Sequence, residues 1–215
     1  MFHLRKLMVL AASALVFGSA EPVPAQTIIN EWASVKAPAA PELKAVKVDP
    51  KTTALLMLDF VKQSCNEKIR PRCVATLAAA KKLLAASRAN NVLVVYSIGA
   101  RAGEQWSIGD TLPDVAPTGK EPYVQAGPDK FLNTDLEKIL KDHGIKTVIV
   151  AGTTASGAVM HTADEAVFRG LKLVVPVDTV SAENAFMEQY VAYHFTSAPR
   201  VGAATTLTSV SMIKF

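Results

Sequence analysis

Short, continuously apolar runs alternate along the chain with longer amphipathic stretches. A run that is apolar at every position is typical of a parallel strand buried on both faces, whereas an apolar stripe at helical spacing is typical of a covering helix. The apolar runs predict strands at residues 53–58, 92–96, 122–125, 146–151, 172–177 and 204–213. The stretches between them predict helices at residues 71–90, 135–143, 157–169 and 183–195.

Residues that start or stop helices support these boundaries. Pro71 suits a first helical position, and Asn133 or Thr134 can cap the second helix, which Gly144 ends. Ser181 can cap the last helix. Because strands and helices alternate, the chain predicts an α/β fold. We expect a three-layer α/β/α sandwich around a mainly parallel, six-stranded, Rossmann-like sheet.

The composition is that of a folded, single-domain protein. The 215 residues suffice for one sizeable core, and with 50% hydrophobic and 20% charged residues the chain is not of the disordered type. We place the domain at residues 52–215 and an arm or linker, interrupted by prolines, at residues 26–51. The net charge of +4 is mild and includes no long basic run, so we expect no nucleic-acid partner.

The N-terminal segment predicts export. A positive start at Arg5 and Lys6 precedes the apolar residues 7–18, which are too few to span a bilayer, and small residues before Gln26 offer a cleavage site. We expect a signal peptide at residues 1–25, with an uncleaved membrane anchor as the alternative. The mature protein would then be periplasmic or secreted and free of the membrane.

The two cysteines, Cys65 and Cys73, lie close together in the sequence. In an oxidising compartment their spacing predicts a disulfide, which would stabilise the fold by on the order of 2.5 kcal/mol through loop closure. Two free thiols or one reactive cysteine are the alternatives. Neither cysteine has a histidine-based partner in the sequence.

The most informative segment is the strand-to-helix turn within residues 148–163. An apolar strand ends in Gly152, Thr153 and Thr154, and a Ser-Gly pair then leads into a helix rich in Ala and Val. In an open α/β sheet, a turn at the carboxyl end of a strand is where ligands bind and reactive groups are displayed.

This turn resembles the signature of the isochorismatase-like hydrolases, the superfamily that includes nicotinamidases and N-carbamoylsarcosine amidases. Residues 56–60, Leu-Met-Leu-Asp-Phe, resemble the family's first strand with its catalytic Asp. Residues 131–145 resemble the helix that precedes the signature strand. The resemblance covers residues 52–213 and implies the fold of the cysteine hydrolases.

The resemblance also implies roles for individual residues. Asp59 corresponds to the catalytic Asp, and Ala158 stands where most members have the nucleophilic Cys, so covalent cysteine chemistry cannot run here. A cis peptide between Thr153 and Thr154 would present the N–H groups of Thr154 and Ala158 as an oxyanion hole. The family's lysine corresponds to Gln125, or to Lys130 if a short gap is allowed.

Each of these residues also has a purely structural interpretation. Asp59 could cap a turn, and Lys130 could be a solvated loop lysine. The histidines lack the spacing of metal ligands, and we expect no metal and no cofactor. Residues that could line the pocket, but could also belong to the core or the surface, are Phe60, Trp106, Phe131 and His161.

Three functions remain open. The first is a hydrolase for a small molecule that needs no Cys nucleophile and uses Asp59 as general acid or base. The second is a non-catalytic small-molecule-binding protein, and a structural role as a homo-oligomer is a weaker third. Lys130 beside Asp59 would favour catalysis, and Gln125 there would favour binding. With Gln125 in the lysine position, Ala158→Cys alone should not create an efficient amidase.

Overall fold

The computed structural model describes residues 27–99, 103–104 and 106–215. The chain divides into two units, residues 1–37 and residues 38–215. The first unit contains the helix α1 (Ile28–Glu31), whereas the expected signal peptide lies outside the described residues. Within the described part of the chain, no helix is long and apolar enough to cross a membrane.

The second unit is built on one parallel sheet, as the sequence predicts. Its strand order is β4-β3-β2-β5-β6-β8, every neighbouring pair in that order is parallel, and the short β7 pairs with β5. A separate parallel pair joins β1 to β9. The strands are β1 (Val46–Lys47), β2 (Thr53–Leu58), β3 (Leu93–Gly99), β4 (Tyr123–Ala126), β5 (Thr147–Thr153), β6 (Lys172–Pro176), β7 (Val180–Ser181), β8 (Thr205–Thr208) and β9 (Ile213–Lys214).

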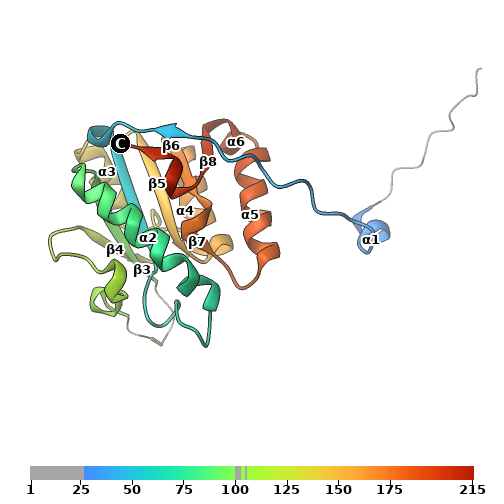
Figure 1. Cartoon of the computed structure of the whole chain (residues 1–215), viewed down its shortest axis with the longest axis horizontal. Helices are drawn as coiled ribbons and strands as arrows, with labels where there is room; N and C mark the ends of the chain where they lie inside the picture. The colour runs from blue at the N-terminus through green and yellow to red at the C-terminus, as the bar shows by residue number, and fades with distance from the viewer. Residues whose placement is uncertain (1–26, 100–102, 105) are drawn as a thin grey trace, which may run out of the picture. The chain divides into compact units, whose positions relative to one another are not determined.

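Helices cover both faces of this sheet (Figure 1). Leu55 and Met57 of β2 pack in the cluster under α2 (Pro71–Ala89), whereas Ala54, Leu56 and Leu58 pack in the cluster on the other face. Both sets are buried because consecutive side chains of a strand point to opposite faces. The second cluster is covered by α3 (Leu136–Asp142), α4 (Met160–Phe168), α5 (Ala185–Ser197) and α6 (Val201–Ala204).

Four predicted boundaries are wrong in detail. The N-cap of α3 is Asp135 rather than Asn133 or Thr134, although the Thr134 hydroxyl accepts a hydrogen bond of 3.2 Å from the N–H of Leu136. Asn184, not Ser181, caps α5, because its side chain accepts a hydrogen bond from the N–H of Met187. The helix expected from residue 157 begins with a π-helical turn at Ala155–Val159, and α4 follows it. The last predicted strand is broken by a 3₁₀ turn that separates β8 from β9. The 3₁₀ turns are Pro50–Thr52, Ile108–Asp110, Pro113–Val115, Val177–Thr179 and Val210–Met212.

The register of the sheet brings the carboxyl ends of its central strands together. Leu58 at the end of β2 lies opposite Gly152 of β5 and Ser97 of β3. Gly152 allows this approach, because a Cβ there would lie 2.3 Å from the carbonyl oxygen of Leu58 and the residue has a φ of 153°. The residues that follow these strands therefore meet at one edge of the sheet, where ligands bind in open α/β folds.

Candidate active site

Asp59 follows β2 and is held in an uncommon backbone conformation. Its φ of 56° lies in the left-handed region, which is sparsely populated by residues other than glycine and is found often at functional sites. The carboxyl group is buried, and its Oδ1 accepts a hydrogen bond of 2.7 Å from the Ser97 hydroxyl of β3. The carboxyl group of Asp59 is thus fixed by two neighbouring strands.

Lys130 comes from the turn after β4 and pairs with Asp59. Its Nζ lies 2.8 Å from Oδ2 of Asp59 and donates a second hydrogen bond, of 3.2 Å, to the carbonyl of Ala126. The side chain of Lys130 is completely buried (0% exposed), so it is not the solvated loop lysine considered from the sequence. A buried ammonium group of this kind requires such partners, because its desolvation is costly.

Burial and hydrogen bonding act on the Asp59 carboxyl in opposite directions. Burial raises the pKa of Asp59 above its ordinary value, because it disfavours the charged form, and this effect exceeds the opposing one. The charge of Lys130 and the hydrogen bonds from Lys130 and Ser97 lower the pKa. Each carboxyl oxygen accepts one side-chain hydrogen bond and can accept another from a ligand or water.

The turn after β5 forms the facing wall of the site. The peptide bond between Thr153 and Thr154 is cis, as the resemblance implies. The carbonyl of Thr154 accepts hydrogen bonds of 3.1 Å from the N–H groups of Gly157 and Val159, which lie on either side of Ala158. Ala158 therefore sits at the start of the helical segment, and its side chain is a methyl group.

Asp59, Lys130 and this turn share a cavity of about 390 Å³. The cavity brings together six of the candidate residues predicted from the sequence: Asp59, Trp106, Lys130, Thr153, Thr154 and Ala158. Trp106 contacts Gly99 at the end of β3, where an added Cβ would lie 2.5 Å from the indole ring. The size is that of a site for a small molecule.

Four predicted residues lie elsewhere. Gln125 is exposed and donates a hydrogen bond of 3.2 Å to the carbonyl of Trp106. It cannot take the lysine position because side chains alternate along β4, so that Val124 and Ala126 are buried and Gln125 points out. Phe60 is buried in the cluster under α2.

The other two pocket candidates have structural contacts. Phe131 is buried in the opposite cluster, where the guanidinium of Arg169 lies 4.5 Å from its ring centroid. His161 is exposed on α4, and its ring nitrogen is 2.8 Å from the carbonyl of Gly157. Neither residue lines the cavity.

The β2–α2 connection contributes residues to the site that the sequence motifs did not indicate. Gln63, Ser64, Ile69 and Arg70 line the cavity. They could have been anticipated, because they follow the strand that ends at Asp59, and such connections line the ligand site of an open α/β sheet.

A disulfide holds this connection. Cys65 and Cys73 are bonded to each other and both are buried, which confirms the predicted pairing. Their Cα atoms are 5.3 Å apart, an ordinary separation for a disulfide.

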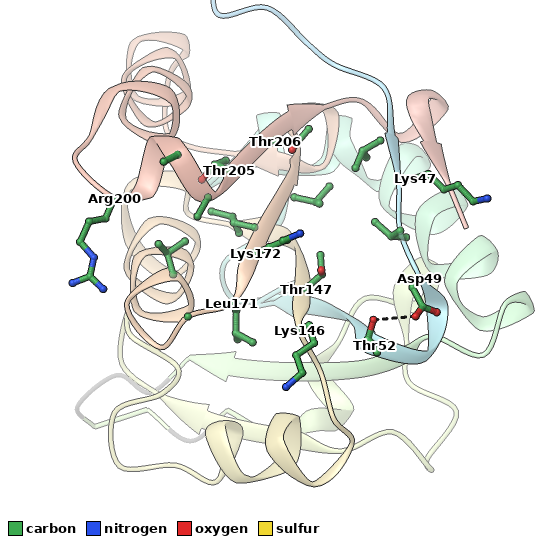
Figure 2. Close-up of a pocket in the computed structure, with 18 residues that line it drawn as sticks. Lys47, Asp49, Thr52, Lys146, Thr147, Leu171, Lys172, Arg200, Thr205 and Thr206 are labelled. Atoms are coloured by element: carbon green, nitrogen blue, oxygen red, sulfur yellow. Dashed lines mark hydrogen bonds between the residues drawn. The ribbon is translucent and has the colours of Figure 1, made fainter.

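A larger hollow in the second unit lies at the other end of the sheet and lacks comparable chemistry. It has a volume of about 790 Å³ and is lined by Lys146 and Lys172, beside the amino ends of β5 and β6. Figure 2 shows Lys47 and Arg200 pointing outward on opposite sides of it. The carboxylate among its lining residues, that of Asp49, accepts hydrogen bonds from the N–H of Lys51 and the hydroxyl of Thr52. Among the described residues, no cluster of His, Cys, Asp or Glu could hold a metal ion.

A parallel α/β domain with a buried charged pair at the carboxyl ends of its strands has the architecture of a small-molecule enzyme or binding protein. The family model described as "Isochorismatase domain" matches residues 53–209. The chain therefore belongs to the isochorismatase-like hydrolase family.

The match to an individual relative covers less of the chain than the match to the family model. The N-carbamoylsarcosine amidase of Arthrobacter sp is 34% identical over 67 residues, which are 31% of this chain and 25% of that protein. The chain thus matches about a quarter of the length of this curated relative.

Solved structures share the fold at lower identity. N-carbamoylsarcosine amidase from Thermoplasma acidophilum is 23% identical with a TM-score of 0.64, over 74% of this chain and 96% of that one. A cysteine hydrolase from Pseudomonas syringae pv. phaseolicola is 20% identical with a TM-score of 0.68, over 80% and 94%. Nicotinamidase from Bacillus subtilis is 18% identical with a TM-score of 0.64, over 74% and 99%.

Proposed function

We propose that this protein hydrolyses a small molecule without a cysteine nucleophile and that Asp59 is its general acid or base. The observation that carries the proposal is the buried ion pair between Asp59 and Lys130, which opens into the cavity beside Ala158. Both partners come from connections outside the strands, so the fold positions them at the ligand-binding edge of the sheet.

Ala158 restricts the chemistry to direct proton transfer. A methyl group cannot form an acyl-enzyme, so water or a proton must react with the substrate directly. The Asp59 carboxylate can take a proton from an attacking water, and the protonated acid can give one to the substrate. Burial raises the pKa of Asp59, which brings the two forms closer in population at moderate pH.

Two positive or polar groups would stabilise negative charge on the substrate. Lys130 donates a hydrogen bond to Oδ2 of Asp59 and lines the same cavity. The N–H groups of Thr154 and Ala158, beside the cis peptide, are the proposed oxyanion hole. Fixed donors aimed at a developing oxyanion can contribute a large share of catalysis.

The relatives suggest which compounds to test first. Their names describe amidases for N-carbamoylsarcosine and nicotinamide. The cavity of about 390 Å³ also suits compounds of this size. We therefore propose a small amide or ureido compound as the substrate class.

A panel of such compounds tests the proposal when the oxidised wild-type protein is compared with Asp59→Asn. We expect turnover of at least one class by the wild type and its loss in the variant. Thermal unfolding of both proteins is the control for folding. Turnover that the Asn variant retains in full would exclude Asp59 as the acid or base.

A non-catalytic binding protein is the second candidate, and Ala158 is the observation that favours it. A binding protein has no need of a nucleophile, but it also has no need of a buried lysine on Asp59. The burial of Lys130 against Asp59 is costly and is typical of a site that uses the charge, so we favour catalysis.

We further propose that the protein is exported. The apolar N-terminal segment and the disulfide between Cys65 and Cys73 support this, since stable disulfides are typical of oxidising compartments.

A further inference from the structure

The cavity holds a third charged side chain, Arg70. Among the described residues that line the cavity, the charged ones are Asp59, Lys130 and Arg70. Asp59 and Lys130 pair with each other. Arg70 pairs with Glu183, which does not line the cavity. The residues that line the cavity therefore carry one positive charge in excess, and Arg70 supplies it.

The backbone of Arg70 is rigidly held. It lies between Cys65 and Cys73, so the disulfide closes the loop that carries it. Its N–H donates to the carbonyl of Asn66 at 2.8 Å, and its carbonyl accepts from the N–H of Cys73 at 3.0 Å. Nη1 donates to the carbonyl of Ser64 at 2.7 Å. A ligand would meet a guanidinium group that is already positioned.

The guanidinium retains capacity for a ligand. Nη2 pairs with a single oxygen of Glu183 at 2.8 Å, and the Nε of Arg70 is buried without a partner among the described residues. The Arg70 side chain is 12% exposed and the Glu183 side chain 52%, so Glu183 approaches from the solvent side. Because a guanidinium has five N–H donors, these bonds leave donors for an oxyanion.

The other walls are partly apolar. Ile69, Trp106 and Pro128 give the cavity apolar surface. Together with the remaining N–H donors of the Arg70 guanidinium, this surface suits a ligand with an apolar body and an oxyanion.

We propose that Arg70 is a specificity-determining residue that selects small carboxylates with an apolar body. In the proposed function, the carboxylate would be a non-reacting part of the substrate, held by Arg70 while the reacting bond faces Asp59. That the bound carboxylate belongs to a substrate rests on the proposed function, whereas the binding of the carboxylate by Arg70 does not.

Benzoate and benzamide test the proposal because they have nearly the same shape and differ in charge. Their binding to the oxidised protein is measured by titration calorimetry at low and moderate salt. We expect the wild type to bind benzoate at least about tenfold more tightly than benzamide. In Arg70→Gln the two affinities should become nearly equal, and Arg70→Lys should retain part of the preference.

Arg72→Gln is the matched control. Arg72 lies two residues further along, in the first turn of α2, and also pairs with a glutamate, Glu188, but it does not line the cavity. This variant should keep the full preference for benzoate. Circular dichroism and thermal unfolding check that each variant is folded, and the wild-type comparison remains decisive if Arg70→Gln does not fold.

Two results would overturn the proposal. One is a wild type that binds benzamide as tightly as benzoate. The other is a folded Arg70→Gln variant that keeps the preference, since the anion would then bind elsewhere. A benzoate preference that depends on Arg70, without turnover of any compound, would contradict the hydrolase function and leave the carboxylate site in place.

Discussion

At the scale of single residues, the site depends on where two side chains lie relative to Asp59. Lys130 reaches its carboxyl group from the turn after β4, and Gln125 on that strand points away from it. Ala158 occupies the turn after β5 in the same cavity. These placements change the result that we expect when a thiol is introduced at position 158.

Ala158→Cys should therefore be sufficient to create a reactive thiol, because Lys130 already supplies the positive charge near the cavity. Adding Gln125→Lys should change the rate of iodoacetamide alkylation by no more than about twofold, because residue 125 is exposed, does not line the cavity, and a charge there is screened by solvent. Mass spectrometry of the non-reduced variants measures this rate. Non-reduced wild-type protein, whose cysteines are paired, should take up no label. A double variant that reacts far faster than the single one would show that residue 125 reaches the site.

Ser97→Ala tests the environment of Asp59 through the pH dependence of activity. The hydrogen bond from Ser97 lowers the pKa of Asp59, so its removal should raise that pKa further. The limb of the pH profile that Asp59 governs should move to higher pH, whether Asp59 acts as acid or base. Activity against pH on a compound from the substrate panel measures this shift. A limb that moves to lower pH would assign it to another group.

At the scale of elements, the β2–α2 connection joins the site to the stability of the fold. The sulfur atoms of Cys65 and Cys73 are buried in the cluster under α2, and the loop between them carries Arg70. The disulfide thus acts on both the folded core and the rim of the cavity.

Replacing both cysteines by serine should lower the free energy of unfolding by about 2.5 kcal/mol, because the unfolded chain regains the freedom of the closed loop. Denaturant unfolding of the oxidised wild type and the double variant measures the difference. A Cys65→Ser/Cys73→Ser protein that is as stable as the wild type would show that the bridge adds nothing beyond native packing.

The sequence predicts the elements better than it predicts the site. Continuous apolar runs determine the central strands, and the motif around Asp59 and Thr153 locates the turns. Lys130 could not be chosen over Gln125, because it lies in a turn beyond the strand and no periodicity fixes where such a side chain points. Phe60 was misplaced because the chain turns at Asp59, and the next side chain enters the core. Arg70 belongs to a loop whose course is set by the disulfide and by local hydrogen bonds.

At the scale of the whole molecule, the sheet separates two hollows of different character. The cavity at the carboxyl ends contains the ion pair, the cis turn and Arg70. The larger hollow at the amino ends is lined by exposed lysines. Substitutions at the carboxyl ends of the strands should therefore change activity and specificity. Substitutions of Lys146 or Lys172 should leave both unchanged.

The proposed export predicts the mature N-terminus. Material recovered from the periplasm or the medium should begin at Gln26, because the preceding small residues are the proposed cleavage site. Intact-mass analysis of that material measures this, and alkylation without reductant should add no mass. Exported protein that retains residues 1–25 would contradict the signal-peptide assignment.

The central claim is that Asp59 transfers the proton in a reaction that needs no thiol. The most direct measurement is the steady-state kinetics of wild type and Asp59→Asn on the best compound of the panel, both oxidised and treated with iodoacetamide. We predict a kcat at least about 100-fold lower in the variant and no effect of iodoacetamide on the wild type. A wild type that iodoacetamide inactivates, or an Asn variant with an unchanged kcat, would contradict the account.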